Sequence, residues 1–364
     1  MRSYSTVLLV GSLTTGLLLG CESEKAGAPG LEPGAPLLAK GGPNSSQFAT
    51  LITLDRFSAA NAVSQAGTII AGYRWRGNIP MTWTLQNGAW TANALPVAAT
   101  ATDAWAKAVN DQGDVAGDDF AAFPASSSRV VLWPSTGGFT VLGCGELGEA
   151  YGMSAEGQLV VGVDRSVQPS TAALWQPGAC REDLPRLNAE GWAVANAING
   201  DGTIVGGGAA PSKSADAVPV RWRRAGGASQ IEQLDTRPGL VFGANSAGDL
   251  VGTAQVPCTS GSGRCNRGMI WYAAGGSRDI GTLGGESTAP RGINAAGEVV
   301  GLSTLSNGNT APFFWSEALG MRQLPVPRTG TGWAFAVSGV RPDGTRIVVG
   351  EGGGSALAWV VRNP

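Results

Sequence analysis

The sequence of 364 residues predicts an all-β fold, a seven-bladed β-propeller that is closed by an N-terminal strand completing the last blade. Three observations lead to this prediction. A short pattern recurs seven times, each copy contains one tryptophan at a fixed place, and the strand that the seventh copy lacks stands ahead of the first copy. A repeat spacing of about 45 residues is typical of propeller blades, which hold four short strands each.

The repeated pattern begins with Ala-x-(Ala/Gly)-(Val/Ile)-(Asn/Ser), passes through a turn that ends in glycine, and continues with an apolar run that also ends in glycine. Successive turn glycines are 46, 44, 45, 46, 49 and 47 residues apart. A glycine that tolerates positive φ suits a tight hairpin, and the short β-branched runs predict strands. The turn glycines are Gly67, Gly113, Gly157, Gly202, Gly248, Gly297 and Gly344.

One tryptophan per copy occupies the third predicted strand. Seven large rings at the same strand position are what the packing of seven similar blades requires, so we predict that they fill the core and do not form a ligand-stacking ring. These residues are Trp83, Trp133, Trp175, Trp222, Trp271, Trp315 and Trp359.

The seventh copy has no fourth strand after its tryptophan, because only five residues follow Trp359. An apolar segment over residues 51–55 precedes the first copy instead. We expect this segment to form the outer strand of the seventh blade, since that pairing closes the ring and removes an open sheet edge. The predicted propeller spans residues 48–364.

Composition excludes several classes of function. The sequence has no histidine, which excludes Ser-His-Asp and Cys-His catalysis and histidine metal ligands. With 25 basic against 27 acidic residues and no basic run, nucleic acid is not an expected partner. No nucleotide-binding or nucleophile-elbow motif is present, so we expect no cofactor. We expect a monomer.

The N-terminus has the pattern of an export signal. Residues 1–20 contain one basic residue and a short apolar stretch, and they end in Leu18-Leu19-Gly20-Cys21. This ending resembles the bacterial lipobox, which implies cleavage before Cys21, acylation of its thiol and a membrane as partner. Residues 21–47 are rich in Gly, Pro and Ala and predict a flexible tether. The resemblance to lipoproteins also implies that the inner-membrane retention signal, an Asp after the acylated Cys, is absent, because Glu22 stands at that position. This favours the outer membrane or cell surface within the envelope.

Four cysteines remain in the exported part of the chain, which suggests two disulfides with three possible connectivities. A zinc site built from all four thiolates is the alternative. The repeat favours pairing Cys258 with Cys265, because both lie inside the enlarged interval between Gly248 and Gly297. Cys144 and Cys180 then remain for each other and would join neighbouring blades.

One segment carries a family resemblance. Residues 279–285 (DIGTLGG) followed by residues 289–294 (APRGIN) resemble the signature of bacterial extracellular HAF-repeat proteins. The other copies depart from that signature. The resemblance implies export and a β-propeller-like array, and no established activity comes with it.

Departures from the repeat are the candidates for ligand binding, most simply of a glycan or an envelope protein. Units two, four and seven each have an additional tryptophan that the other units lack. These three tryptophans are expected just ahead of the innermost strand. The position three before the repeated Asn/Ser also varies and includes aromatic and cationic side chains, which stack on rings and donate hydrogen bonds. The alternative is that these side chains only plug the blade tops. The candidates are Trp105, Lys107, Tyr151, Trp192, Phe242, Arg291, Trp333 and Phe335.

Two alternatives involve acidic residues. Asp118-Asp119, Glu182-Asp183 or Asp216 could supply the two carboxylates of a propeller glycan-active hydrolase, although we expect them in solvated surface connections. The turn over residues 199–202 has oxygen ligands that suit calcium, but hairpin chemistry explains it. The sequence therefore favours an exported, lipid-anchored propeller that acts as a non-catalytic binding or scaffold module at the cell envelope, and it assigns no catalytic or metal-binding residue.

Overall fold

The computed structural model describes residues 48–99, 101–121, 127–259, 261, 263–327 and 330–362. The expected signal peptide (residues 1–20), Cys21 and the tether (residues 21–47) lie outside the described residues. The described part contains strands and no α-helix, and hence no helix long and apolar enough to cross a membrane.

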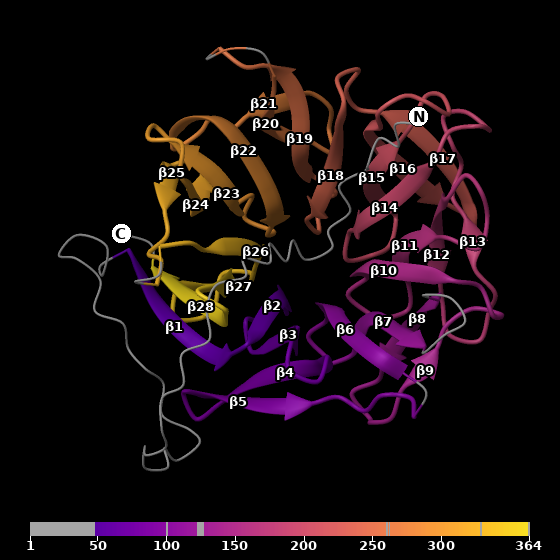
Figure 1. Ribbon diagram of the computed structural model, residues 1–364, viewed down its shortest axis with the longest axis horizontal. Coiled ribbons are helices and arrows are strands. Elements are labelled where there is room, and N and C mark those ends of the chain that lie inside the picture. Colours follow the sequence, from indigo (N-terminus) through magenta and orange to yellow (C-terminus); the bar gives the residue numbers. More distant parts are fainter. Residues whose placement is uncertain are drawn as a thin grey trace, which may run out of the picture. The chain divides into compact units, whose positions relative to one another are not determined.

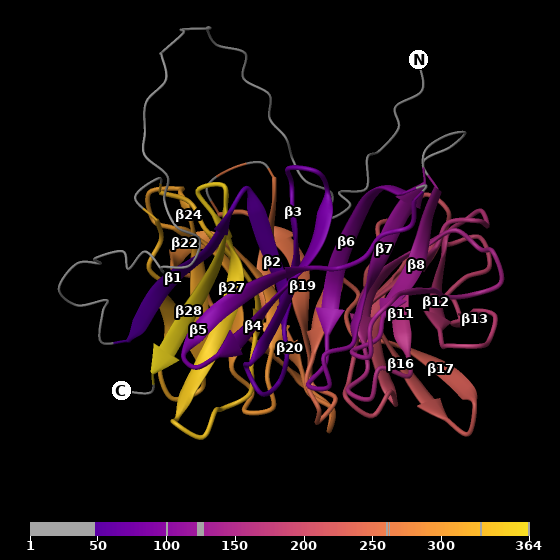
Figure 2. The same cartoon turned by 90° about the horizontal axis from the view of Figure 1, so that it is seen from below.

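Seven four-stranded antiparallel sheets form a ring, as predicted (Figure 1). The inner strand of each blade borders the axis, and the side view shows the strands running from one face of the ring to the other (Figure 2). The inner strands of blades 1 to 7 are β2 (Ser58–Val63), β6 (Ala101–Val109), β10 (Gly148–Met153), β14 (Ala193–Ile198), β18 (Gly239–Ala244), β22 (Gly284–Ile293) and β26 (Trp333–Val337). The second strands are β3 (Ile69–Arg74), β7 (Val115–Ala121), β11 (Val160–Asp164), β15 (Ile204–Ala209), β19 (Leu250–Pro257), β23 (Val299–Leu305) and β27 (Thr345–Gly352).

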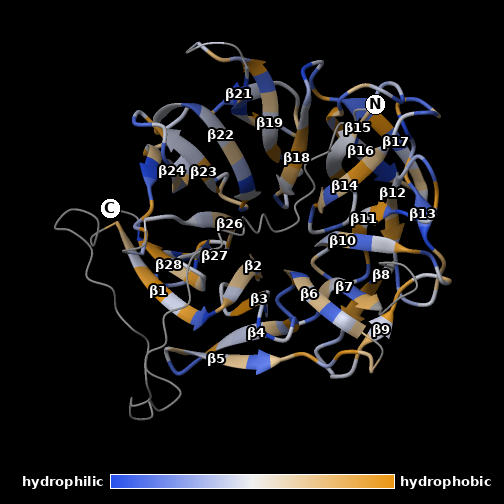
Figure 3. Cartoon of the chain, viewed as in Figure 1, coloured by the Kyte–Doolittle hydropathy of each residue, from blue (hydrophilic) through white to orange (hydrophobic). Residues whose placement is uncertain are grey.

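The third and outer strands complete each blade. The third strands are β4 (Ile79–Gln86), β8 (Ser127–Trp133), β12 (Thr171–Trp175), β16 (Val218–Ala225), β20 (Arg264–Trp271), β24 (Thr310–Ser316) and β28 (Ser355–Arg362). The outer strands are β5 (Ala89–Ala94), β9 (Thr140–Val141), β13 (Glu182–Asp183), β17 (Ala228–Gln233), β21 (Ser277–Asp279), β25 (Gly320–Gln323) and, in blade 7, β1 (Ala49–Arg56). At the rim, the outer strand β13 is hydrophilic (Figure 3).

The ring closes as the sequence predicts. Blade 7 has the strand order β1-β28-β27-β26, so its outer strand comes from the N-terminal side of the chain. β1 pairs with β28 from Ala49 opposite Val361 to Arg56 opposite Ser355. The predicted segment, residues 51–55, lies inside this strand.

The repeated tryptophans are buried, which confirms their assignment to the core: each is at most 5% exposed. Three of them also link neighbouring blades, because the indole N–H donates to a proline carbonyl beside the preceding blade's outer strand. Trp133 bonds to Pro96 at 2.6 Å, and Trp359 bonds to Pro325 at 2.7 Å. The Leu-Pro step of the repeat thus supplies the acceptor for the tryptophan of the next blade.

The Asn or Ser that ends the first element of the repeat is buried and holds the hairpin that follows it. Asn110 Oδ1 accepts the N–H of Asp114 at 2.8 Å, and Asn199 Oδ1 accepts the N–H of Ile204 at 2.8 Å. The same side chains join blades, since Asn294 Nδ2 donates to the carbonyl of Ser338 at 2.8 Å. The repeated position is therefore structural in every blade. Its members are Ser64, Asn110, Ser154, Asn199, Asn245, Asn294 and Ser338.

Deleting residues 48–57 removes β1 and exposes the edge of β28, so we expect the melting temperature to fall by about 10 °C or more. Deleting residues 22–45, which lie outside the strands, should leave the melting temperature unchanged. Calorimetry on both variants measures this difference. Equal effects of the two deletions would exclude closure by β1.

Candidate functional site

Each inner strand carries a β-bulge, and the seven extra residues are the variable positions that the sequence marked as candidates. The ladder to the second strand skips one residue in every blade, for example Lys107 between Ala106 and Ala108, or Arg291 between Pro290 and Gly292. In each blade the residue before the bulge is buried and the bulged residue is half-buried. The bulged residues are Asn61, Lys107, Tyr151, Asn196, Phe242, Arg291 and Phe335.

The bulged residues lie on the inner strands, which border the axis of the ring and have no neighbouring strand on that side. Two of them serve the ring itself. Asn61 Nδ2 donates to the carbonyl of Ala106 at 2.9 Å, and Asn196 Nδ2 donates to the carbonyl of Val241 at 2.8 Å, each in the next blade. The amides are thus structural, and the aromatic and cationic members remain as candidates.

The candidates form three groups. Lys107 Nζ lies 4.7 Å from the Tyr151 ring and 5.6 Å from the Trp105 ring. Arg291 Cζ lies 4.2 Å from the Phe242 ring, and the Trp333 and Phe335 rings are 6.3 Å apart. Among the described residues, Trp192 has no ring contact with another candidate; it lies just ahead of β14, and its carbonyl accepts the N–H of Ala210.

The expected position of two tryptophans was wrong. Trp105 lies inside β6 and Trp333 is the first residue of β26, so both belong to the inner strand and do not precede it. Both stand two residues before their bulge, whereas Trp192 stands four residues before its own. The inner strands of these two blades begin ahead of the repeated Ala-x-(Ala/Gly) pattern from which they were predicted, so the tryptophan that precedes the pattern is part of the strand.

Lys107 belongs to a buried ionic network between blades 2 and 3. Its ammonium pairs with Asp118, which is 0% exposed and also accepts the N–H of Ala150 at 2.5 Å. Glu149 accepts from the Tyr151 hydroxyl and pairs with Arg165, both at 2.5 Å. Two carboxylates and two cations balance one another in this network.

Burial sets the ionisation of the network. Burial raises the pKa of Asp118 to about 6, against the charge and hydrogen bond of Lys107, which lower it. Burial also raises the pKa of Tyr151, together with the neighbouring Glu149 carboxylate. Burial acts to raise the pKa of Glu149 too, but Lys107, the Tyr151 hydroxyl and Arg165 hold it below its ordinary value.

The expected surface position of Asp118 and Asp119 was wrong. Both are buried on β7, where successive side chains point to opposite faces of the sheet. Asp119 pairs with Arg129 at 2.5 Å. Glu182 on the outer strand β13 pairs with Arg224, while Asp216 is exposed and pairs with Arg264. Each of these carboxylates thus has a cationic partner.

Sequence reasoning missed the residue that joins blade 7 to blade 1. Phe57 alone separates β1 from β2, whereas four or more residues separate the outer strand of every other blade from the next inner strand. The Phe57 N–H donates to Gly354 in blade 7, and its carbonyl accepts from Trp75 in blade 1, both at 2.7 Å. This double role holds Phe57 at a φ of 55°, a left-handed conformation that costs a phenylalanine roughly 1–2 kcal/mol.

The side chains around this junction form the most aromatic part of the exposed surface. We define the seam face by Phe57, Trp75 and Trp333, which are 47%, 38% and 39% exposed and are the exposed large aromatic residues of the described chain. Arg76 Cζ lies 4.5 Å from the Phe57 ring. A hollow of about 350 Å³ beside Phe57 is lined by Arg56, Pro327 and the turn over residues 352–355.

Aromatic contacts extend from the seam face into blade 2. The ring of Tyr73, whose pKa burial raises, lies 5.6 Å from the ring of Trp105. The Trp105 ring lies 5.0 Å from that of Phe120. Burial also raises the pKa of Glu351, which pairs in register with Trp333. The candidates Trp333 and Phe335 thus belong to blade 7 and Trp105 to blade 2, on either side of blade 1.

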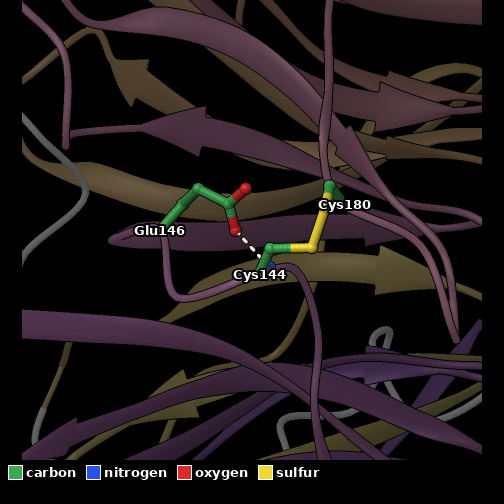
Figure 4. A group of neighbouring side chains, drawn as sticks. All are labelled: Cys144, Glu146 and Cys180. Atoms are coloured by element: carbon green, nitrogen blue, oxygen red, sulfur yellow. Dashed lines mark hydrogen bonds between the residues drawn. A yellow bond between two sulfur atoms is a disulfide. The ribbon is translucent and has the colours of Figure 1, made fainter.

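The four described cysteines form the two predicted disulfides. Cys144 bonds to Cys180 with a Cα–Cα distance of 4.9 Å and joins the connection after β9 to blade 3, with Glu146 beside the pair (Figure 4). Cys258 bonds to Cys265 with a Cα–Cα distance of 5.1 Å inside the β19–β20 hairpin. With these sulfurs bonded in pairs, no thiolate among them is available to zinc. In the turn considered for calcium, Asp201 accepts from the backbone and hydroxyl of Thr203, which lowers its pKa.

Comparisons with protein-family models and with curated proteins find no match. Among solved structures, puromycin hydrolase is similar with a TM-score of 0.50 and 14% identity, over 82% of this chain and 51% of that one, so this chain spans about half its length. The β-propeller domain of the Trilobed protease from Pyrococcus furiosus has a TM-score of 0.50 and 11% identity over 84% and 94% of the two chains. That domain is described as having an open velcro topology, whereas β1 closes the ring here.

A gluconolactonase from Xanthomonas campestris is similar with a TM-score of 0.47 and 13% identity, over 91% of this chain and 99% of that one. At identities this low, the two structures with a TM-score of 0.50 support the propeller fold alone and say nothing about activity.

The raised pKa of Asp118 predicts a pH dependence of stability. A carboxyl group with a folded pKa of about 6 and an ordinary value of 3.8 stabilises the fold below pH 3.8, and this contribution is lost as the pH rises through 6. Relative to Asp118→Asn, the wild-type free energy of unfolding should fall by roughly 3 kcal/mol between pH 3.8 and 7. Denaturant titrations of both proteins across this range measure the difference, and parallel pH profiles would refute the assignment.

Proposed function

We propose that this protein is an exported, lipid-anchored β-propeller that binds a glycan at the cell envelope without chemically altering it. The observation that carries the proposal is the seam face. Phe57, Trp75 and Trp333 expose three large rings at one end of blades 7 and 1, although the seven repeated tryptophans are buried.

The chemistry of the seam face suits a sugar chain. Flat aromatic rings offer apolar faces on which sugar rings stack, and nearby polar groups fix the orientation of a ligand in a hollow. Arg56 lines the hollow, and Arg76 lies over one face of Phe57. Because backbone bonds from two blades hold Phe57, its backbone is already fixed and only the side-chain torsions remain to be ordered on binding.

The envelope location rests on the N-terminal segment. The lipobox-like residues 18–21 and the resemblance of residues 279–294 to HAF-repeat proteins both imply export. Two disulfides agree with an oxidising compartment, since disulfides are rare in proteins kept in a reducing cytosol. We infer that Cys21 carries the lipid and that residues 21–47 hold the propeller away from the membrane.

The hydrolase alternative receives less support. Asp118 and Asp119 point to opposite faces of β7 and pair with Lys107 and Arg129. A glycosidase needs two carboxyl groups on either side of one scissile bond, at about 5–10 Å from each other. Neither this pair nor the exposed Asp216, which pairs with Arg264, has that arrangement.

The binding proposal predicts that Trp75→Ala and Trp333→Ala each weaken glycan binding about tenfold, which corresponds to about 1.4 kcal/mol. Phe57→Asn should act in the same direction, because asparagine tolerates the left-handed conformation and removes only the ring. Binding is measured by calorimetry on the full mature protein, with a ligand first selected from peptidoglycan fragments and envelope polysaccharides.

The matched control is Val340→Ala, because Val340 is 52% exposed but lies at the opposite end of blade 7, beyond β26. Its binding should equal that of the wild type. Absence of saturable binding to any glycan in the panel, or binding that tolerates both tryptophan substitutions, would refute the proposal. Release of shorter sugars during the incubation would favour the hydrolase.

The anchor proposal predicts that Cys21→Ser releases the protein from membranes or blocks its maturation, because serine offers no thiol for acylation. Membrane fractionation and the mass of the mature N-terminus measure this. Ser23→Ala, in the same segment, should fractionate as the wild type does. A Cys21→Ser protein that stays membrane-bound and is processed as before would contradict the anchor.

A further inference from the structure

Arg291, a half-buried cation, differs from five well-buried cations of the described part of the chain. Five cationic side chains that are 17% exposed or less each lie beside a carboxylate. These pairs are Lys107–Asp118, Arg181–Asp164, Arg221–Glu232, Arg224–Glu182 and Arg346–Glu298. The guanidinium of Arg291 has neither a carboxylate nor a carbonyl acceptor among the described residues. The residues before and after it, Pro290 and Gly292, carry no charge.

Arg291 lies on an inner strand of the ring, so its charge is close to the axis. Arg291 is the bulged residue of β22, and its neighbour Pro290 is buried while Arg291 is half-buried. The guanidinium lies over the Phe242 ring at 4.2 Å, from the preceding blade. The next blade contributes Phe335 at the equivalent bulge. An apolar ring on either neighbouring blade thus accompanies one cation whose hydrogen-bond donors have no acceptor among the described residues.

Lys107, the other cation among the seven bulged residues, does have an acidic partner. Asp118 neutralises Lys107. Among the seven bulged residues, the charge of Arg291 therefore remains without a paired carboxylate in the described part of the chain. Burial lowers the pKa of Arg291 to about 10, and no acidic group in the described part of the chain opposes this shift. A partly desolvated guanidinium without a counter-ion is unfavourable, and a bound anion would remove that cost.

We propose that Arg291 is the centre of an oxyanion site at the axis of the ring, which takes a ligand bearing a carboxylate or phosphate group. The planar fork of a guanidinium binds both groups through two parallel hydrogen bonds. The flanking phenylalanines favour a ligand whose remainder is apolar or flat. This site is separate from the seam face, so it stands or falls independently of glycan binding.

The test compares the melting temperature of the full mature protein in sodium chloride, sodium acetate and sodium phosphate at equal ionic strength. Acetate or phosphate should raise the wild-type melting temperature saturably, because a ligand that binds only the folded state stabilises it. A response to acetate alone would identify a carboxylate site, and a response to phosphate alone would identify a phosphate site.

Arg291→Met supplies the decisive variant. Methionine has similar length and no charge, so it should raise the melting temperature in chloride by about 2 °C or more and abolish the saturable response. Arg322→Gln, which removes an exposed arginine on the outer strand β25, should keep the wild-type response.

Three results would overturn the proposal: no saturable anion response in the wild type, an equal response in Arg291→Met, or a lower melting temperature of Arg291→Met in chloride. The last result would mean that Arg291 only fills space beside Phe242.

Discussion

The ring depends on how closely the two innermost strands of each blade approach each other. The glycine that ends each apolar run faces the residue before the bulge, and a Cβ atom there would lie within 2.3 Å of an inner-strand carbonyl oxygen. For Gly72 the oxygen is that of Ala59, and for Gly350 it is that of Trp333. Real Cβ contacts are far longer, so only glycine fits. This contact lets each inner strand bulge, and the bulge presents one side chain per blade at the axis. The seven glycines are Gly72, Gly117, Gly162, Gly207, Gly252, Gly301 and Gly350.

The same crowding acts between blades. A Cβ atom on Gly243 would lie 2.8 Å from the carbonyl oxygen of Arg291, and one on Gly292 would lie 2.9 Å from Cα of Ala336. The residue after each bulge is therefore small in every blade. Because the position after the bulge is restricted to glycine and alanine and the position before it is buried, the half-buried bulged residue has more freedom to vary than either neighbour. This explains why the candidates of the axial site lie at a single position of the repeat.

Closure of the ring creates the other candidate surface. Elsewhere the chain passes from an outer strand to the next inner strand through four or more residues, but at the seam only Phe57 is available. Its N–H completes the ladder of blade 7 and its carbonyl begins that of blade 1. The cost of its left-handed backbone is tolerated because both ladders fix it. The exposed ring of Phe57, with Trp75 and Trp333, is a direct result of this junction.

The sequence predicted the features that repeat, because seven copies of a local signal reinforce one another. The buried tryptophans, the hairpin glycines, the closing strand and both disulfide pairs follow from that register. Non-local features were missed. Asp118 and Asp119 look like a solvated pair until Lys107 from the neighbouring strand and Arg129 are placed beside them. Trp105 was expected ahead of the inner strand because β6 begins several residues before the repeated pattern that marks it. The left-handed residue at the seam was missed because it is a phenylalanine, whereas glycine or asparagine normally signals such a turn.

Amide hydrogen exchange, resolved residue by residue on the full-length protein, tests the closed seam most directly. The account predicts that the bonded amides of β1 and the Phe57 N–H exchange as slowly as those that join β27 to β28. Fast exchange over residues 49–57 beside slow exchange in β27 and β28 would contradict it, because blade 7 would then end at β28 and the seam face would have no fixed framework.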